Sequence, residues 1–206
     1  MEGAMTESTP RIIGQRDAYL TELFKIFKED KDCIFISADN GAPTMDAFVR
    51  ELPGQFVQVG IAEQHAVGMA SGLAVEGKRV WFYAIAPFVT ARVWEFVKLD
   101  VCAVNLPITL LGVGSGYAYD IMGPSHHSVD DISIMRVLPN LEIWSPADSV
   151  CAAGLAQHVY DRSCPAYIRF DRTGIQDIDR PANFSLDAGA WEDWFGCELS
   201  HRRICA

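Results

Sequence analysis

Short apolar runs alternate along this chain with longer segments in which apolar residues recur every three or four positions. The first of the longer segments carries Leu20, Leu23, Phe24 and Phe27 on one face of a helix. Cys33-Ile-Phe-Ile-Ser37, in contrast, is a continuous run of the kind that forms a buried strand. The two patterns predict strands at 33–37, 56–59, 80–85, 107–113, 140–144 and 166–170, and helices at 16–29, 44–52, 63–77, 87–103, 130–138 and 147–161.

The strict alternation of strands and helices predicts an α/β fold: a doubly wound, mainly parallel sheet of about six strands with helices on both faces. Thr44 is the expected N-cap of the second helix, and Asp148 is expected in the first turn of the last one. In such sheets ligands bind beyond the carboxyl ends of the strands. The segments that follow these ends should therefore meet at one edge of the sheet: Asp39, Glu63, Phe88, the glycine-rich loop 114–128 and Arg172.

The charge and composition of the chain argue against several kinds of binding partner. The net charge of −10 and the lack of any run of Lys or Arg argue against nucleic acid and against anionic membranes. The apolar run 80–89 is too short to span a bilayer. Residues 1–10 are polar and lack the apolar core of a signal peptide, so we expect them to be disordered and the protein to be cytoplasmic. The six cysteines form no CxxC pair, which favours buried, reduced thiols and no metal site.

Residues 58–73 carry the most informative local pattern. A short strand runs into Gly60, and Glu63 then opens a helix rich in Ala and Gly. A solvent-facing Glu in a first helical turn is one interpretation, because a helix start stabilises a carboxylate. However, Gly60-Ile-Ala-Glu-Gln-His65 and the helix after it resemble the pyrimidine-binding domain of the transketolase family. The version seen in 1-deoxyxylulose-5-phosphate synthases and in split, two-subunit transketolases is the most similar, and the resemblance spans roughly residues 15–172.

This resemblance implies a site for thiamine diphosphate. In the family, the residue that matches Glu63 hydrogen-bonds N1′ of the aminopyrimidine ring, and Phe88 matches an aromatic residue that stacks on this ring. The same match assigns Asp39 and Ile61 to cofactor binding. The alternative for Phe88 is ordinary core packing, because Phe is mostly a buried residue.

Two further segments match the substrate side of the family's site. Gly123-Pro-Ser-His-His127 resembles a Gly-Pro-Thr-His segment whose His contacts substrate hydroxyls and can shuttle a proton, which gives this role to His126. Arg172 and Arg16 match arginines that bind a sugar phosphate, a task that suits the bidentate guanidinium. The His pair could instead be structural, exposed or an adventitious metal site, and both arginines could be ordinary surface residues.

Other positions depart from the family pattern. Gly114 stands where transketolases usually carry a His, and Met122 stands where they carry an Asp that contacts a donor hydroxyl. Pro43 falls near the place of a family Ser. The cofactor half of the pattern is therefore kept, while the sugar half is altered. This argues against ordinary pentose-phosphate substrates and favours a specialised relative.

The family's motif for the diphosphate and Mg²⁺ is missing from the sequence. No Gly-Asp-Gly occurs, so the resemblance implies a larger partner subunit that carries the diphosphate-binding domain. It also implies self-association into a heterotetramer, with the small-residue helix after Glu63 at a two-fold contact. We expect a pyrimidine-binding domain over 11–180, and a divergent or truncated tail over 181–206.

The predicted function is that of one subunit of a thiamine-diphosphate-dependent transketolase. Such an enzyme passes a two-carbon ketol unit from a ketose or ketose phosphate to an aldehyde. Three alternatives stay open: the β subunit of a 2-oxo-acid dehydrogenase, an enzyme like deoxyxylulose-phosphate synthase, and a non-catalytic regulatory subunit that kept the fold.

Overall fold

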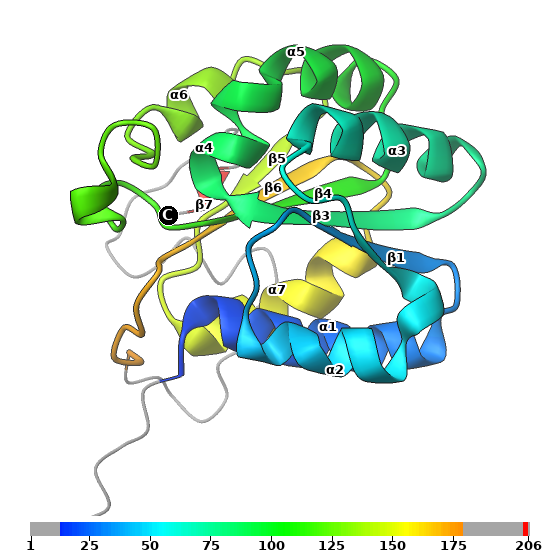
Figure 1. The fold of residues 1–206 in the computed structure, drawn as a ribbon, viewed down its shortest axis with the longest axis horizontal. Coiled ribbons are helices and arrows are strands. Elements are labelled where there is room, and N and C mark those ends of the chain that lie inside the picture. Colours follow the sequence, from blue (N-terminus) through cyan, green and yellow to red (C-terminus); the bar gives the residue numbers. More distant parts are fainter. Residues whose placement is uncertain (1–12, 179–203, 206) are drawn as a thin grey trace, which may run out of the picture.

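The chain forms a parallel sheet between two layers of helices, as the computed structural model of residues 13–178 and 204–205 shows (Figure 1). The strands are β1 (Cys33–Ser37), β2 (Phe56–Gln58), β3 (Arg79–Ile85), β4 (Ile108–Val113), β5 (Glu142–Trp144), β6 (Ala166–Phe170) and the two-residue β7 (Ile204–Cys205). The helices are α1 (Gln15–Glu29), α2 (Asp46–Glu51), α3 (Glu63–Val75), α4 (Ala86–Val89), α5 (Trp94–Phe96), α6 (Asp131–Met135) and α7 (Ser149–Tyr160).

The sheet has the order β2-β1-β3-β4-β6-β5-β7, and every pairing in it is parallel. The prediction of a doubly wound sheet with about six strands is therefore confirmed, with β7 as a short addition at the edge next to β5. Residues 1–10 and most of the tail 181–206 lie outside the described residues. Among the helices that the structure describes, none is long and apolar enough to cross a membrane.

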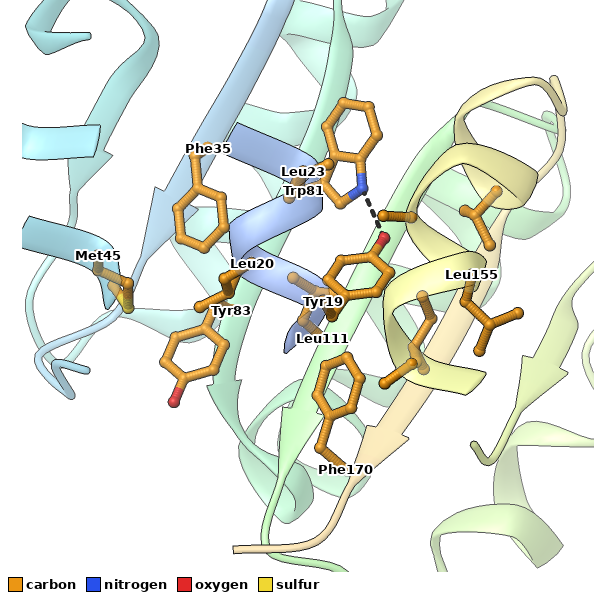
Figure 2. Close-up of a cluster of buried hydrophobic side chains, with 14 of the residues drawn as sticks. Tyr19, Leu20, Leu23, Phe35, Met45, Trp81, Tyr83, Leu111, Leu155 and Phe170 are labelled. Atoms are coloured by element: carbon orange, nitrogen blue, oxygen red, sulfur yellow. Dashed lines mark hydrogen bonds between the residues drawn. The ribbon is translucent and has the colours of Figure 1, made fainter. Parts of the chain in front are cut away.

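Both faces of the sheet are buried, which explains why its strands read as continuous apolar runs. Along β3, Trp81 and Tyr83 point into the cluster under α1, α2 and α7, whereas Val80 and Phe82 point to the opposite face. Figure 2 shows the first cluster, in which the indole Nε1 of Trp81 donates a hydrogen bond of 3.1 Å to the hydroxyl of Tyr19. The helices α3, α4, α5 and α6 cover the other face (Figure 1).

The register of the strands brings their carboxyl ends to one edge. Ser37 of β1 pairs with Tyr83 of β3, and Ile85 of β3 pairs with Val113 of β4, which in turn pairs with Phe170 of β6. Chain segments that leave these four strands therefore start side by side. The loop 114–128, in green in Figure 1, projects from this edge.

The helix predicted at 87–103 is not continuous. α4 ends at Val89, and the backbone leaves the helical region at Thr90, where φ is −120° and ψ is −92°. The hydroxyl of Thr90 donates to the carbonyl of Ala86 at 2.8 Å, which satisfies the last turn of α4. A 3-10 turn (Ala91–Val93), α5 and a π-helical turn (Val97–Cys102) continue the segment. The prediction of one continuous helix was wrong, because the backbone leaves the helical region at Thr90. The hydroxyl bond does not by itself explain the break, since Thr21 and Ser71 make the same bond within the continuous helices α1 and α3.

The two capping predictions had different outcomes. Thr44 is not an N-cap: it lies in a 3-10 turn before α2, and its hydroxyl donates to Oδ1 of Asp17 at 2.9 Å, which ties this turn to α1. Asp148 is the N-cap of α7 itself, one position before the first turn, and its Oδ1 accepts a bond of 2.9 Å from the backbone N–H of Cys151. The hydroxyl of Thr44 is engaged with Asp17 and does not cap α2. Asp148 has two oxygens, so it caps α7 with Oδ1 and accepts a bond from the N–H of Ile178 with Oδ2.

Candidate active site

Glu63 is a buried carboxylate at the first residue of α3. Gly60, with a left-handed φ of +69°, turns the chain out of β2, and α3 begins three residues later. The side chain of Glu63 is only 3% exposed, and its Oε1 accepts a hydrogen bond of 2.7 Å from Nη1 of Arg92. The positive end of the helix dipole and this guanidinium both face the carboxyl group at this depth.

Arg92 links Glu63 to Phe88. The guanidinium carbon of Arg92 lies 3.6 Å from the centroid of the Phe88 ring, within the range of a cation–π interaction. The side chain of Arg92 is about one third exposed, so its guanidinium lies at the mouth of the site rather than inside the core. The sequence analysis did not assign a role to Arg92. Its spacing of four residues from Phe88 would place the two residues on one face of the predicted helix 87–103, but the structure breaks this helix at Thr90, between them.

His126 lies on the other side of Phe88. Their ring centroids are 5.1 Å apart with an interplanar angle of 66°, an edge-to-face contact. Nδ1 of His126 is 3.0 Å from the hydroxyl of Ser125. The next residue, His127, turns away: its Nε2 is 2.9 Å from the carbonyl oxygen of Asp120, and its ring packs against Tyr117. The two histidines therefore occupy separate environments.

Tyr119 connects His126 to the two predicted phosphate-binding arginines. The ring centroids of Tyr119 and His126 are 5.9 Å apart, and the guanidinium carbon of Arg172 lies 4.8 Å from the Tyr119 centroid. Burial raises the pKa of the Tyr119 phenol, while the positive charges of Arg172 and Arg16 act to lower it. Arg16 also makes an ion pair of 2.9 Å with Asp17. The sequence analysis did not single out Tyr119.

The remaining predicted site residues are less closely tied to this group. Asp39 and Ile61 are exposed, Ile61 by 78%, and neither has a hydrogen bond or ion pair within the described part of the chain. Both still follow the strands β1 and β2 at the same edge of the sheet. The structure thus brings five predicted residues into one group and leaves two at its margin. The group contains Glu63, Phe88, His126, Arg172 and Arg16.

The departures from the family pattern have structural counterparts. Gly114 has a left-handed φ of +86° and lies beneath the ring of Tyr119. Met122 is 54% exposed. Over residues 13–178, no group of three or more His, Cys, Asp or Glu side chains is placed to hold a metal ion.

Comparison with known proteins identifies the family. The family model described as "Transketolase, pyrimidine binding domain" matches residues 13–176. A protein of Phocaeicola vulgatus, named as one subunit of an apulose-4-phosphate transketolase, is 36% identical over 179 residues, which are 86% of this chain and 57% of that protein. The "6-deoxy-6-sulfo-D-fructose transketolase subunit SqwH" of a Clostridium species is 30% identical over 165 residues, which are 80% of this chain and 51% of that protein. The chain thus spans about half the length of these curated relatives.

Among solved structures, a "Split gene transketolase, inactive beta4 tetramer" superposes with a TM-score of 0.73 at 30% identity, over 85% of this chain and 55% of that one. Sequence and fold therefore agree, and the resemblance of this chain to the transketolase pyrimidine-binding domain is confirmed. The chain belongs to the family of transketolase pyrimidine-binding domains.

Proposed function

We propose that this chain is the pyrimidine-binding subunit of a thiamine-diphosphate-dependent transketolase. It transfers a two-carbon ketol unit from a ketose or ketose phosphate to an aldehyde, together with a larger subunit that binds the diphosphate and Mg²⁺. The observation that carries this proposal is the buried carboxylate of Glu63 at a helix start, beside Phe88 and His126 at the carboxyl edge of the sheet. Family membership and the naming of both relatives as transketolase subunits support it.

The residues of this group fit the pyrimidine end of the cofactor. An aminopyrimidine offers a ring nitrogen and a flat π face, and Glu63 and Phe88 supply a carboxyl group and an aromatic face at one place. One guanidinium, that of Arg92, contacts both groups. The diphosphate and Mg²⁺ need other ligands, because the described residues provide no cluster of three potential metal ligands. This distribution supports the assignment of these groups to a partner subunit.

Each side chain then has a defined task. When bound, thiamine diphosphate would supply a nucleophilic thiazolium carbon for the ketose carbonyl and an electron sink for cleavage of the carbon–carbon bond. Glu63 would hydrogen-bond or protonate the ring nitrogen N1′, and its Oε2 is available for this while Oε1 is bound to Arg92. Phe88 holds the ring by stacking. His126 moves a proton to or from a substrate oxygen, and Arg16 and Arg172 hold the anionic end of the sugar.

The substrate is a ketose derivative with an anionic end other than an ordinary pentose phosphate. Gly114 and Met122 replace two polar side chains on the sugar side of the family's site. The names of the two relatives include a 4-phosphate and a 6-sulfo group. Arg16 and Arg172 both lie near the Tyr119 hydroxyl, and an anionic group of either kind would find two guanidinium groups there.

The complex is a heterotetramer that contains two copies of this chain. Gly68 and Gly72 lie on the exposed side of α3, and a methyl group at either position would meet nothing within 4 Å in the chain. Packing inside the chain therefore does not require these glycines, whereas close approach of a second copy would. The naming of the Phocaeicola vulgatus relative as one subunit of its enzyme supports a second kind of subunit. The split transketolase structure is described as an inactive beta4 tetramer, which supports contact between copies of this kind of chain.

The test is ketol transfer by the complex of this chain with its larger subunit, with Glu63→Gln and the matched control Glu22→Gln. Glu22 lies in α1 and pairs with Lys25 at the surface. We expect Glu63→Gln to reduce turnover to the background rate with an unchanged circular dichroism spectrum, and Glu22→Gln to be as active as the wild type. Full activity of the Glu63→Gln complex would refute the assignment, and micromolar cofactor binding by the isolated monomeric chain would refute the shared site.

A further inference from the structure

Tyr119 is folded back onto the first residue after β4. A Cβ atom built on Gly114 would lie 2.1 Å from Cε2 and 2.5 Å from Cδ2 of the Tyr119 ring, so any side chain at position 114 would collide with it. The φ of +86° at Gly114 adds a second reason for glycine at this position. The Tyr119 ring therefore fills the space into which a side chain at position 114 would extend.

The backbone around Tyr119 holds the ring in this place. The N–H of Gly114 donates to the carbonyl of Phe170 at 2.9 Å, which fixes the start of the loop to the end of β6. The N–H of Gly116 donates to the carbonyl of Ser128 at 2.9 Å, and the reverse bond is 2.8 Å, so the loop is closed on itself. The N–H of Met122 donates to the carbonyl of Tyr119 at 2.8 Å. These bonds anchor the loop on both sides of the tyrosine.

The neighbours of Tyr119 lie at the two ends of the proposed sugar site. The ring of His126, the proposed proton carrier, lies at a centroid distance of 5.9 Å. The guanidinium carbon of Arg172 lies 4.8 Å from the same ring centroid, and the charges of Arg172 and Arg16 both act on the phenolic oxygen. Tyr119 is thus a common neighbour of the residue proposed for proton transfer and of those proposed to bind the anion.

The Tyr119 hydroxyl is available to such a substrate. Within the described residues it makes no hydrogen bond, in contrast to the buried hydroxyls of Tyr19 and Tyr167, which are paired with Trp81 and Asp131. Because burial raises the pKa of Tyr119, its phenol keeps its proton at neutral pH and can donate a hydrogen bond. A neutral donor that feels the charge of two guanidinium groups suits an oxygen of a sugar chain next to an anionic group.

We propose that Tyr119 contacts the substrate and determines its specificity: its ring forms the wall of the sugar site over Gly114, and its hydroxyl donates to a sugar oxygen between the reacting carbon and the anionic end. The inference rests on the proposed function, because that function gives His126 its role at the reacting carbon and Arg16 and Arg172 their role at the anionic end of the sugar. The ligand is a sugar chain that ends in a phosphate or a sulfonate, whose tetrahedral anions present the same oxygens to the arginines.

The experiment compares Tyr119→Phe with Tyr117→Phe in the complex with the larger subunit. Tyr117 is in the same loop, is 69% exposed and packs on His127, so it is a matched control. Fructose 6-phosphate, xylulose 5-phosphate and 6-deoxy-6-sulfofructose serve as donors. Loss of one hydrogen bond worth about 1–2 kcal/mol should raise KM for the preferred donor roughly 5- to 30-fold. We expect kcat to change less than KM, cofactor affinity to be unchanged, and Tyr117→Phe to behave as the wild type.

A second pair of variants tests the position of the ring. Gly114→Ala should raise KM at least as much as Tyr119→Phe, because the added methyl group displaces the ring. In a Tyr119→Ala background, the same substitution should have a much smaller additional effect on KM, because the collision is gone. Equal effects of Gly114→Ala in both backgrounds would show that the Tyr119 ring does not form this wall.

Binding of the same three donors to the full chain, measured by isothermal titration calorimetry, separates this inference from the proposed function. If the wild-type complex has no ketol-transfer activity but the chain binds a donor, and Tyr119→Phe weakens this binding, the proposed function fails and the binding role of Tyr119 stands. If Tyr119→Phe binds and turns over the donors as the wild type does, the inference is overturned. If the wild type neither binds nor converts any of the three, both are overturned.

Discussion

The ion pair between Glu63 and Arg92 gives a sharp test of the site's internal electrostatics. Arg92→Ala removes the hydrogen-bond donor to a carboxylate that is 3% exposed, and it also removes the cation that covers the ring of Phe88. The carboxylate stays buried in the variant with only the backbone at the start of α3 to stabilise it. We therefore expect Arg92→Ala to lower the free energy of unfolding.

The magnitude follows from three contributions. A hydrogen bond between charged groups contributes about 1.5–3 kcal/mol. Removal of one partner from a fully buried ion pair costs about 3–5 kcal/mol, but the Arg92 side chain is one third exposed, so water screens part of this cost. The contact of the cation with Phe88 adds roughly 0.5–1 kcal/mol. Together these give a loss of about 2–3 kcal/mol, or a decrease in Tm of about 5–10 °C for a chain of this length.

The assay is urea denaturation of wild type, Arg92→Ala, Glu63→Gln and the double variant. Glu63→Gln alone should destabilise by about 1–2 kcal/mol, because it replaces a charge-assisted bond with a neutral one. In the Arg92→Ala background the same substitution should stabilise by about 1 kcal/mol, because it removes an unpaired buried charge. Arg50→Ala is the control, since Arg50 pairs with Glu51 at the surface and should change stability by less than about 0.5 kcal/mol. Equal destabilisation by Glu63→Gln in both backgrounds would refute the reasoning.

Two further predictions concern residues outside the ion pair. Gln15 is 3% exposed, and its side chain binds the carbonyl of Pro146 at 2.6 Å and the N–H of Asp171 at 2.8 Å. Gln15→Ala should therefore lower the free energy of unfolding, measured by urea denaturation, by about 2–4 kcal/mol, and the control Gln157→Ala at an exposed position should lower it by less than about 0.5 kcal/mol. Similar losses for the two variants would contradict this. Burial raises the pKa of the Cys102 thiol to about 12. Iodoacetamide at pH 8 should therefore label Cys102 in urea but not in the folded chain, as judged by peptide mass spectrometry. Labelling in the native state would show that the thiol is accessible.

The fold could be predicted from sequence because its signals are local and repeated. Runs such as Cys33-Ile-Phe-Ile-Ser37 are buried on both faces of a parallel sheet, and their shortness and their β-branched and aromatic residues favour a strand over a buried helix segment. Once strands and helices alternate, the handedness of the crossovers leaves few arrangements, and the carboxyl ends must share an edge. This is why the meeting of Glu63, Phe88 and the loop 114–128 was predictable.

Features that depend on a single tertiary contact were not predictable. Thr44 has the residue type of an N-cap, but Asp17, 27 positions earlier in the chain, takes its hydroxyl. For Thr44 the sequence offers two partners for one hydroxyl, and only the packed structure determines which one is used. The break at Thr90 falls in a segment that has helical spacing throughout, and no local signal marks it.

The roles of Arg92 and Tyr119 needed coordinates for a related reason. The spacing of Arg92 from Phe88 suggests a shared face, but the contact with Glu63 crosses 29 positions and joins two helices. Tyr119 lies in an irregular loop, where no periodicity predicts the direction of a side chain. The signal that could have drawn attention to Tyr119 is Gly114, because a glycine directly after a buried strand often marks close approach by another group.

The contacts at this edge of the sheet also determine how a ligand can bind there. Each guanidinium group has a partner within the chain: Arg92 contacts Glu63 and Phe88, Arg16 pairs with Asp17, and Arg172 lies against the Tyr119 ring. A ligand can add to these contacts, because Arg92 binds Oε1 of Glu63, Oε2 has no hydrogen bond among the described residues, and a guanidinium group carries five N–H donors. Where a ligand displaces one of the contacts instead, the measured affinity is a difference between two sets of interactions. Removal of Arg92 weakens the fold through its lost contacts with Glu63 and Phe88, but it leaves the carboxyl group and the aromatic face proposed to hold the pyrimidine ring. Stability and cofactor affinity are thus separate properties at Arg92, and a variant that unfolds more easily can bind as well as the wild type.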